Sequence, residues 1–285
     1  LELMRTTHAN LESIYGLYSD KDGVALEILQ AAAGEAPVVG TISDQSGCDH
    51  KLQQITDPEI IQNLVKALDT ATLLIADGHH RYETALAYYK EHPSEPGANK
   101  ILITLTAFED EGLLVLPTHR LVRGLSPETV QNLPAKLKDA GFDVSEISLD
   151  TPALAPGSFG FDVFTKNGIF RALLLAGVKP DSVIHENYST AWKSLDVSLL
   201  SILVLDKIFG IPLDALSTTD QVRYTRDRAE AIEKIKAGEF DAAFLLTRPT
   251  MENIQAVGAA GEKMPQKSTF FYPKLLSGLV MRSLV

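Results

Sequence analysis

The stretch that decides the fold is TLLIADGHHRYETALAYYKEH, at residues 72–92. Its apolar beginning, Leu73–Ala76, predicts a short buried strand that stops at Asp77–Gly78. Beyond the turn, apolar side chains recur at helical spacing, at Tyr82, Ala85, Leu86 and Tyr89. The stretch therefore predicts a strand, a tight turn and a helix.

The turn between this strand and this helix has the features of an anion site. The first turn of a helix leaves backbone N–H groups without partners, and the helix dipole adds positive character there. Gly78 allows a sharp turn or a close approach to a ligand. Arg81 supplies a planar fork that suits phosphate or carboxylate. Asp77 either caps the helix or takes part in the site.

The two histidines of the turn are expected to point in different directions. His79 flanks the apolar stripe of the helix, which is typical of a residue at the edge of a core, whereas His80 lies opposite the stripe. We therefore expect His80 to be the more ligand-facing of the two. Helical zinc ligands are usually spaced i, i+4, so this adjacent pair predicts no metal site.

Composition places the chain among ordinary soluble globular proteins. Of its 285 residues, 45% are hydrophobic and 22% are charged. Its 37 acidic and 26 basic residues give a net charge of −11, which disfavours general nucleic-acid binding. The only cysteine, Cys48, allows no intramolecular disulfide and predicts a reducing, cytoplasmic setting. No apolar run approaches the roughly 20 residues of a membrane span.

Strand and helix patterns alternate irregularly along the chain. This order predicts an α/β or α+β class with a mixed sheet. A boundary near Gly124 would separate an α/β portion at 1–124, which carries the DGHHR turn, from a second α/β portion at 125–285. The runs Ile101–Ala107 and Leu113–Leu116 predict a hairpin with an acidic tip. Lys166–Asn167–Gly168 predicts another hairpin.

The first residue is Leu and no signal peptide follows it, so we expect the chain to begin inside a longer protein.

Two further groups of polar residues are candidates for the site. The segment GEKMPQKSTFFYPK, at residues 261–274, gathers ammonium and hydroxyl groups, which suit phosphate or carboxylate. These groups belong to Lys263, Lys267, Lys274, Ser268 and Thr269. Thr118–His119–Arg120 follows a strand and Pro117, and either completes a cationic pocket or is structural. The lysines, likewise, either bind an anion or only balance the surface charge.

Four motifs together resemble the bacterial and archaeal domain-of-unknown-function family 1015. They are IADGHHRYETAL at 75–86, PTHRL at 117–121, LDVSLL at 195–200 and GEKMPQKSTFFYPKLLSGLV at 261–280. The family usually carries a further N-terminal region, which this chain lacks. It has no settled activity, so the resemblance narrows the fold more than the reaction.

The DGHHR turn also resembles the phosphate-binding turn of the ParB–sulfiredoxin superfamily, in which a strand, a polar turn ending in Arg and a helix hold a nucleotide. The resemblance implies that Gly78, His79, His80 and Arg81 line the phosphates. Sulfiredoxins have a reactive Cys in the turn and this chain has none there, so thiol repair is not expected. Serine kinases of the superfamily have a catalytic carboxylate ahead of the turn. We expect the counterpart of this carboxylate in the further N-terminal region of the family.

These observations lead to one preferred hypothesis and two alternatives. The preferred function is phosphoryl transfer to or from a small hydroxyl metabolite such as serine, with ATP or ADP and Mg²⁺. Arg81 would hold the phosphates, His80 would act as acid or base, and Asp77 would position Mg²⁺ or the acceptor. Lys267 and Ser268 would close over the anion. One alternative is a phosphatase that uses His80 or His119. The other is a nucleotide-responsive switch without turnover.

Overall fold

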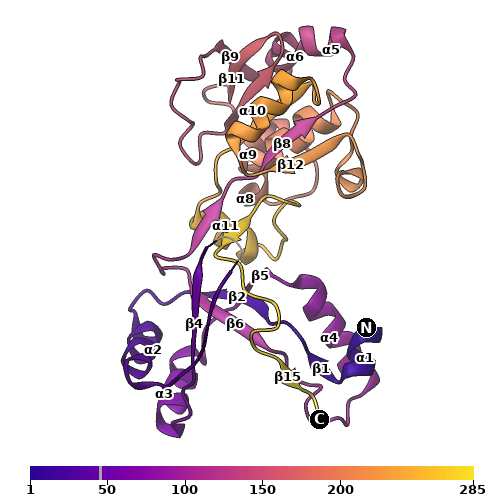
Figure 1. The fold of residues 1–285 in the computed structure, drawn as a ribbon. Helices are drawn as coiled ribbons and strands as arrows, with labels where there is room; N and C mark the ends of the chain where they lie inside the picture. The colour runs from indigo at the N-terminus through magenta and orange to yellow at the C-terminus, as the bar shows by residue number, and fades with distance from the viewer. Residues whose placement is uncertain (45–46) are drawn as a thin grey trace. The chain divides into compact units, whose positions relative to one another are not determined.

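The computed structural model describes residues 1–44 and 47–285, and the chain divides into two compact units. The first unit contains Leu1–Leu113 and Pro273–Val285, and the second contains Leu114–Tyr272. The expected boundary near Gly124 lies inside the second unit. Both units combine helices with strands, which confirms the mixed α/β class, and several separate sheets are formed (Figure 1).

The first unit is built around a three-stranded mixed sheet in the order β5-β2-β6. The middle strand, β2 (Ile14–Tyr18), is buried along its whole length. It runs antiparallel to β5 (Leu74–Asp77) and parallel to β6 (Ile103–Ala107). The other elements of this unit are α1 (Glu2–Thr7), β1 (Ala9–Asn10), α2 (Val24–Glu35), β3 (Val38–Ser43), β4 (Asp49–Gln53), α3 (Pro58–Leu68), α4 (His79–Glu91) and β15 (Arg282–Ser283).

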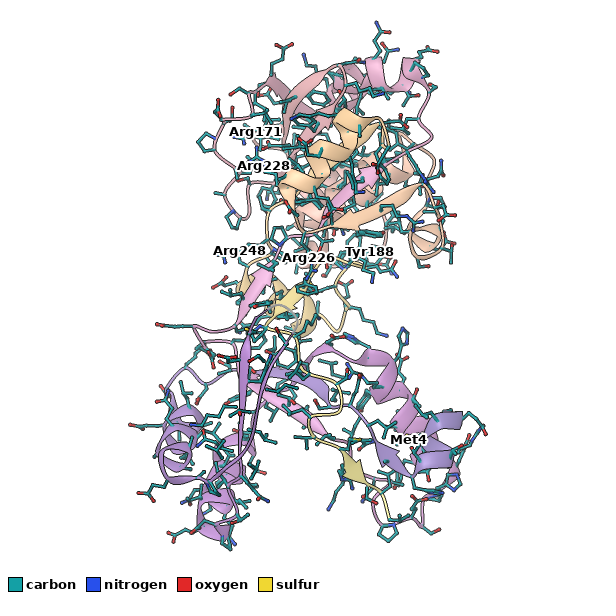
Figure 2. The ribbon with its side chains drawn as sticks, viewed as in Figure 1. Met4, Arg171, Tyr188, Arg226, Arg228 and Arg248 are labelled. Carbon is teal, nitrogen blue, oxygen red and sulfur yellow. The ribbon has the colours of Figure 1, made fainter. Side chains whose placement is uncertain are left out.

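The expected strand, turn and helix of residues 72–92 are present as β5, Gly78 and α4. β5 is half-buried rather than buried, because it lies at the edge of its sheet. The buried face of α4 also differs from the expected stripe. Ala85 and Tyr88 pack in a small core with Met4 of α1 (Figure 2). The remaining stripe residues are exposed by 37–43%, and they are Tyr82, Leu86 and Tyr89.

The second unit contains a six-stranded antiparallel sheet in the order β12-β8-β13-β10-β11-β9. Alternate residues of its strands enter two separate clusters, so the sheet is covered on both faces. Helix α10 (Arg228–Ala237) packs in the smaller cluster, whereas α6 (Leu133–Asp139), α9 (Asp196–Leu199) and the π-helical η1 (Leu200–Asp206) pack in the larger one. The strands are β12 (Val222–Thr225), β8 (His119–Val122), β13 (Ala242–Leu245), β10 (Gly160–Thr165), β11 (Gly168–Leu174) and β9 (Phe142–Glu146).

One of the two expected hairpins forms and the other does not. β10 and β11 pair around Lys166–Asn167, which confirms the first. The prediction of a hairpin between Ile101–Ala107 and Leu113–Leu116 was wrong. Instead, β6 pairs with β2, and β7 (Leu114–Leu116) pairs with β14 (Phe270–Tyr272). The reason is that the fully buried β2 offers β6 a longer partner than the three residues of β7.

The remaining elements of the second unit are short. They are α5 (Pro127–Gln131), α7 (Pro180–Val183), α8 (Thr190–Lys193), η2 (Leu213–Ser217) and α11 (Met251–Ala259). None of the described helices combines the length and the apolar character needed to cross a bilayer.

Candidate functional site

A small pocket lies at the turn between β5 and α4 in the first unit. It has a volume of about 160 Å³. Three segments line it: the approach to β2, the turn itself, and the C-terminal segment of the unit. The lining residues are Glu12, Ser13, Tyr15, Asp77, Arg81, Lys274, Leu275, Leu276 and Ser277.

Arg81 joins the turn to the segment that enters β2. Its Nη1 donates to Oε2 of Glu12 at 2.7 Å and to the carbonyl of Ser13, also at 2.7 Å. Gly78 makes room for this side chain: an added Cβ would lie 3.0 Å from Nε of Arg81 and 3.1 Å from Ile14. The φ of Gly78 is +92°, a conformation that L side chains rarely adopt. Glycine is therefore required here for the position of the guanidinium.

Asp77 is held in its ionised form by the groups around it. The Nζ of Lys274 lies 2.9 Å from its Oδ2, and the Gly78 N–H donates to its Oδ1 at 2.8 Å. Partial burial alone would raise the pKa of Asp77, but the hydrogen bond and charge of Lys274, the Gly78 N–H and the charge of Arg81 together lower it. Of the two alternatives for Asp77, the helix cap is not formed, because Gly78 takes the N-cap position and α4 has no side-chain cap.

Glu12 completes a balanced set of charges in the pocket. The Ser277 hydroxyl donates to its Oε1, while its Oε2 accepts from Arg81. The pocket thus holds two carboxylates and two cations, and the hydroxyl of Ser277 is bound to one of the carboxylates. An incoming anion competes with these carboxylates for Arg81 and Lys274. Conversely, the Glu12 and Asp77 carboxylates are oxygen donors of the kind that Mg²⁺ accepts beside phosphate oxygens.

The two histidines of the turn lie outside the lining of this pocket. The side chain of His80 is fully exposed, and its Nδ1 lies 3.5 Å from Oε2 of Glu83. His79 is exposed too, although its place beside the apolar stripe predicted the edge of the core. Because α4 buries the Ala85–Tyr88 face, its first turn directs both imidazoles toward solvent.

The second unit holds the remaining predicted residues, beginning with His119. This side chain is 6% exposed, and the Leu246 N–H donates to its Nδ1 at 3.2 Å. Burial lowers the pKa of His119 to about 4, and the nearby charges of Arg120 and Arg228 act in the same direction. At neutral pH the imidazole is therefore uncharged and accepts a backbone hydrogen bond.

Arg120 is buried, and its donors are engaged by backbone carbonyls. Nη1 donates to the carbonyl of Thr118, and Nη2 donates to those of Gln266 and Lys267 at 3.2 and 3.0 Å. Burial lowers the pKa of Arg120 to about 10. The guanidinium of Arg120 therefore holds the loop that precedes β14 against β8 through hydrogen bonds.

That loop, residues 261–269, presents its lysines to solvent. Lys263 and Lys267 are exposed, and Thr269 is half-buried. Ser268 is buried and donates to the carbonyl of Pro265 at 2.6 Å. Lys274 belongs to the first unit, so the polar cluster seen in the sequence is divided between the two units.

Sequence reasoning missed four polar residues that line the pocket: Glu12, Ser13, Tyr15 and Ser277. Glu12 is separated from Arg81 by 69 positions and from Ser277 by 265. No local pattern signals such a contact.

The family model described as "Protein of unknown function (DUF1015)" matches residues 1–198. The chain belongs to this family. The match confirms the resemblance seen in the motifs, of which GEKMPQKSTFFYPK lies beyond the matched range. No match was found among curated protein sequences.

Three solved structures show distant similarity to this DUF1015 protein. A conserved hypothetical protein from Pyrococcus furiosus has 16% identity and a TM-score of 0.44, over 95% of this chain and 92% of that one. A free serine kinase in complex with AMP has 14% identity and a TM-score of 0.42, over 91% and 83%. SbnI from Staphylococcus aureus, with a C-terminal truncation, has 12% identity and a TM-score of 0.40, over 97% and 88%.

Proposed function

We propose that this DUF1015 protein binds a phosphorylated small molecule at the β5–α4 turn and transfers a phosphoryl group between a nucleotide and a small hydroxyl compound. One observation carries the proposal. Arg81, Lys274 and the Ser277 hydroxyl meet the carboxylates of Asp77 and Glu12 in one pocket at the N-terminus of a 13-residue helix. Helix N-termini favour anions, and Arg and Lys are the side chains that hold phosphate.

The size of the pocket limits what it can enclose. Its volume of about 160 Å³ lies below the roughly 300–1,000 Å³ of sites that enclose a whole small-molecule ligand. It suits a phosphate group, with the rest of the ligand lying outside it. We propose ATP or ADP as that ligand. We also propose that β5, the Gly78 turn and the first turn of α4 act as a phosphate turn of the ParB–sulfiredoxin kind.

In the proposed reaction, the acceptor hydroxyl oxygen attacks the terminal phosphorus of ATP, and the bond to the bridging oxygen breaks so that ADP leaves with the electron pair. The hydroxyl proton passes to a carboxylate. Asp77 is ionised and solvent-accessible, so it can accept this proton or orient the hydroxyl. Glu12 is the second carboxylate within the same pocket. Mg²⁺, when bound, would neutralise charge on the phosphates.

The role predicted for His80 as acid or base changes accordingly. As the side chain is fully exposed and does not line the pocket, we propose that it meets the outer part of a bound ligand. His119 and Arg120 are engaged by backbone groups of the second unit, and we leave them out of the proposed site. The single cysteine favours a cytoplasmic setting for the protein.

The test combines ligand-induced thermal stabilisation with a turnover assay. The chain is heated with ATP, ADP, inorganic phosphate or phosphoserine, with and without Mg²⁺, and ATP with serine is followed by phosphorus NMR. A ligand at a hundred times its Kd stabilises the folded form by about 2.7 kcal/mol. We expect a shift with ATP or ADP, which Lys274→Ala abolishes and Lys90→Ala, an exposed position in the last turn of α4, retains.

Glu12→Gln separates binding from chemistry. It removes the carboxylate that competes for Arg81, so ATP binding should persist or strengthen, while turnover should fall if Glu12 takes part in the reaction. Binding without product would favour the nucleotide-responsive switch. Phosphate release from phosphoserine without nucleotide would favour the phosphatase. Equal shifts in wild type and Lys274→Ala would refute the proposed site.

A further inference from the structure

The hairpin formed by β3 and β4 brings together three side chains of different chemistry that lie outside the candidate pocket. They are Asp44, Cys48 and His50, all half-buried. One ligand atom from each, a carboxylate oxygen, the thiol sulfur and an imidazole nitrogen, lies within 4.8 Å of the other two. The candidate function makes no use of this cluster.

The register of the hairpin explains why the three side chains meet. Ile42 pairs with His50, and the Asp44 N–H donates to the Cys48 carbonyl at 2.9 Å, which extends the pairing by one more step. Successive residues of a strand point to opposite faces, so positions 44, 48 and 50 share one face. Directly opposed and diagonal neighbours on such a face lie within reach of each other. In a hairpin, the spacing D-x3-C-x-H thus brings potential ligands to one face, as the i, i+4 spacing does in a helix.

Asp44 already orients the group. Its Oδ1 accepts from the Cys48 N–H at 3.0 Å, and its Oδ2 lies 3.0 Å from Nε2 of His50. The side chains of Asp44 and His50 are 23% and 18% exposed, so the cluster is sheltered but open to solvent on one side. A cation that entered between them would replace the proton shared by the carboxylate and the imidazole.

We propose that Asp44, Cys48 and His50 form a binding site for a zinc-like divalent cation. Thiolate, imidazole and carboxylate are the three ligand types of protein zinc sites, at about 2.3, 2.0–2.1 and 2.0–2.2 Å. In a tetrahedron with such bonds, the ligand atoms lie about 3.3–3.8 Å apart. The three ligand atoms lie within 4.8 Å of one another, and Oδ2 of Asp44 already lies 3.0 Å from Nε2 of His50, so binding requires only small side-chain movements. Mg²⁺ and Ca²⁺, which take oxygen ligands, are excluded by the sulfur and nitrogen donors.

With three protein ligands, the fourth tetrahedral position is open to water or to an added ligand. Binding must release the thiol proton, so affinity should fall as the pH is lowered. The site is separate from the Mg²⁺ expected beside phosphates at the β5–α4 turn, and its presence or absence leaves the proposed function unaffected.

The test is a titration of the whole chain with Co²⁺, followed by absorption spectroscopy. The chain's single cysteine makes the spectrum specific, because a thiolate-to-cobalt charge-transfer band reports Cys48 alone. We expect this band, with the visible bands of tetrahedral cobalt, to saturate at one equivalent and to disappear on adding Zn²⁺. Cys48→Ser should abolish the band, and His50→Gln and Asp44→Asn should each weaken Co²⁺ binding by at least tenfold.

Asp49→Asn supplies the matched control within the same hairpin. The Asp49 carboxylate accepts from the Ser43 hydroxyl at 2.5 Å, and Asp49 lies between two of the proposed ligands in sequence. It should bind Co²⁺ as the unsubstituted chain does. The proposal is overturned if no charge-transfer band appears, if Asp49→Asn weakens binding as much as Asp44→Asn, or if the band saturates at half an equivalent with two chains joined through Cys48. In the first case the three side chains would serve only as hydrogen-bonding partners that fix the turn.

Discussion

Replacing His119 with Asn should make the stability of the second unit less sensitive to acid. The imidazole is 6% exposed, and its Nδ1 accepts from the Leu246 N–H. The Oδ1 of Asn occupies the place of Nδ1 and preserves that hydrogen bond, but it does not titrate. Lost packing should make the variant less stable than the unsubstituted chain at pH 7, by about 0.5–3 kcal/mol. The informative quantity is the change with pH.

The size of this change follows from the pKa of His119, which the folded structure lowers from 6.5 to about 4. Between these two values the unfolded chain binds a proton that the folded chain does not, so the group's contribution is complete above pH 6.5 and is lost as the pH falls toward 4. For a shift of this size, linkage gives a loss of about 2 kcal/mol between pH 7 and pH 5. His119→Asn should lack this part of the acid sensitivity.

Urea unfolding at pH 5, 6 and 7 measures the effect, with tryptophan fluorescence as the signal. The single tryptophan, Trp192, is buried in the larger core of the second unit, and its ring stacks on that of Tyr188 with 3.9 Å between the ring centroids. Its fluorescence therefore reports the unfolding of this unit. His185→Asn, at an exposed position in the same unit, is the control and should keep the acid sensitivity of the unsubstituted chain. Other titrating groups act equally in all three proteins.

Equal pH dependence in the unsubstituted chain and in His119→Asn would refute this reasoning. The imidazole would then titrate near its ordinary pKa in the folded protein. A proton acceptor and donor of that kind is what the phosphatase alternative requires, so the same experiment decides whether His119 returns to the list of catalytic candidates.

Three further changes test the backbone and charges of the first unit. Gly78→Ala should cost about 1–3 kcal/mol in urea unfolding, because φ is +92° and the new Cβ would press on the guanidinium of the turn. Lys274→Ala should raise the pKa of Asp77 toward its usual range, which carboxyl NMR titration can follow. As the pH is lowered, the variant would then lose the stability that the Asp77 carboxylate provides at a higher pH than the unsubstituted chain does. Gly97→Ala should loosen the C-terminal strand and speed its proteolysis, because a Cβ there would lie 2.2 Å from the Leu284 carbonyl oxygen.

A glycine in open surroundings is the control for the two glycine changes. Gly34 lies inside α2, and an added Cβ there would meet no other atom within 4 Å. Gly34→Ala should be neutral or stabilising, since alanine favours helix. If Gly78→Ala and Gly97→Ala behave like Gly34→Ala, the steric argument fails. For Lys274→Ala, an unchanged pKa of Asp77 would show that the ammonium group does not hold this carboxylate ionised.

Elements that depend on neighbouring residues could be predicted from the sequence. The strand, turn and helix of residues 72–92 follow from an apolar run, a glycine and helical periodicity. The hairpin at Lys166–Asn167 follows from its turn residues. In each case the energetics are local, so a short window contains the necessary information.

Pairings between distant segments could not be predicted in this way. β6 pairs with the buried β2 and not with β7, its neighbour in the sequence, although the short acidic turn between β6 and β7 favoured a hairpin. The buried face of α4 was misjudged for a related reason. Tyr82 and Tyr89 fit an apolar stripe, but the available partners, Met4 and Leu284 at the two ends of the chain, cover the face of Tyr88 instead.

The same distinction decides what could be known about the candidate site. A glycine followed by an arginine at the start of a helix predicts an anion site, and Arg81 does point into a polar pocket. The sequence could not predict that Glu12, 69 positions away, would already occupy that guanidinium. The pairing engages Nη1, which donates to Glu12 and to the Ser13 carbonyl. A phosphate can therefore bind the other N–H groups of the guanidinium beside Glu12, or replace the carboxylate on Nη1. A phosphate that replaces Glu12 on Nη1 would release this carboxylate at the place where an acceptor must be positioned, which would link recognition of the anion to the assembly of the reactive site.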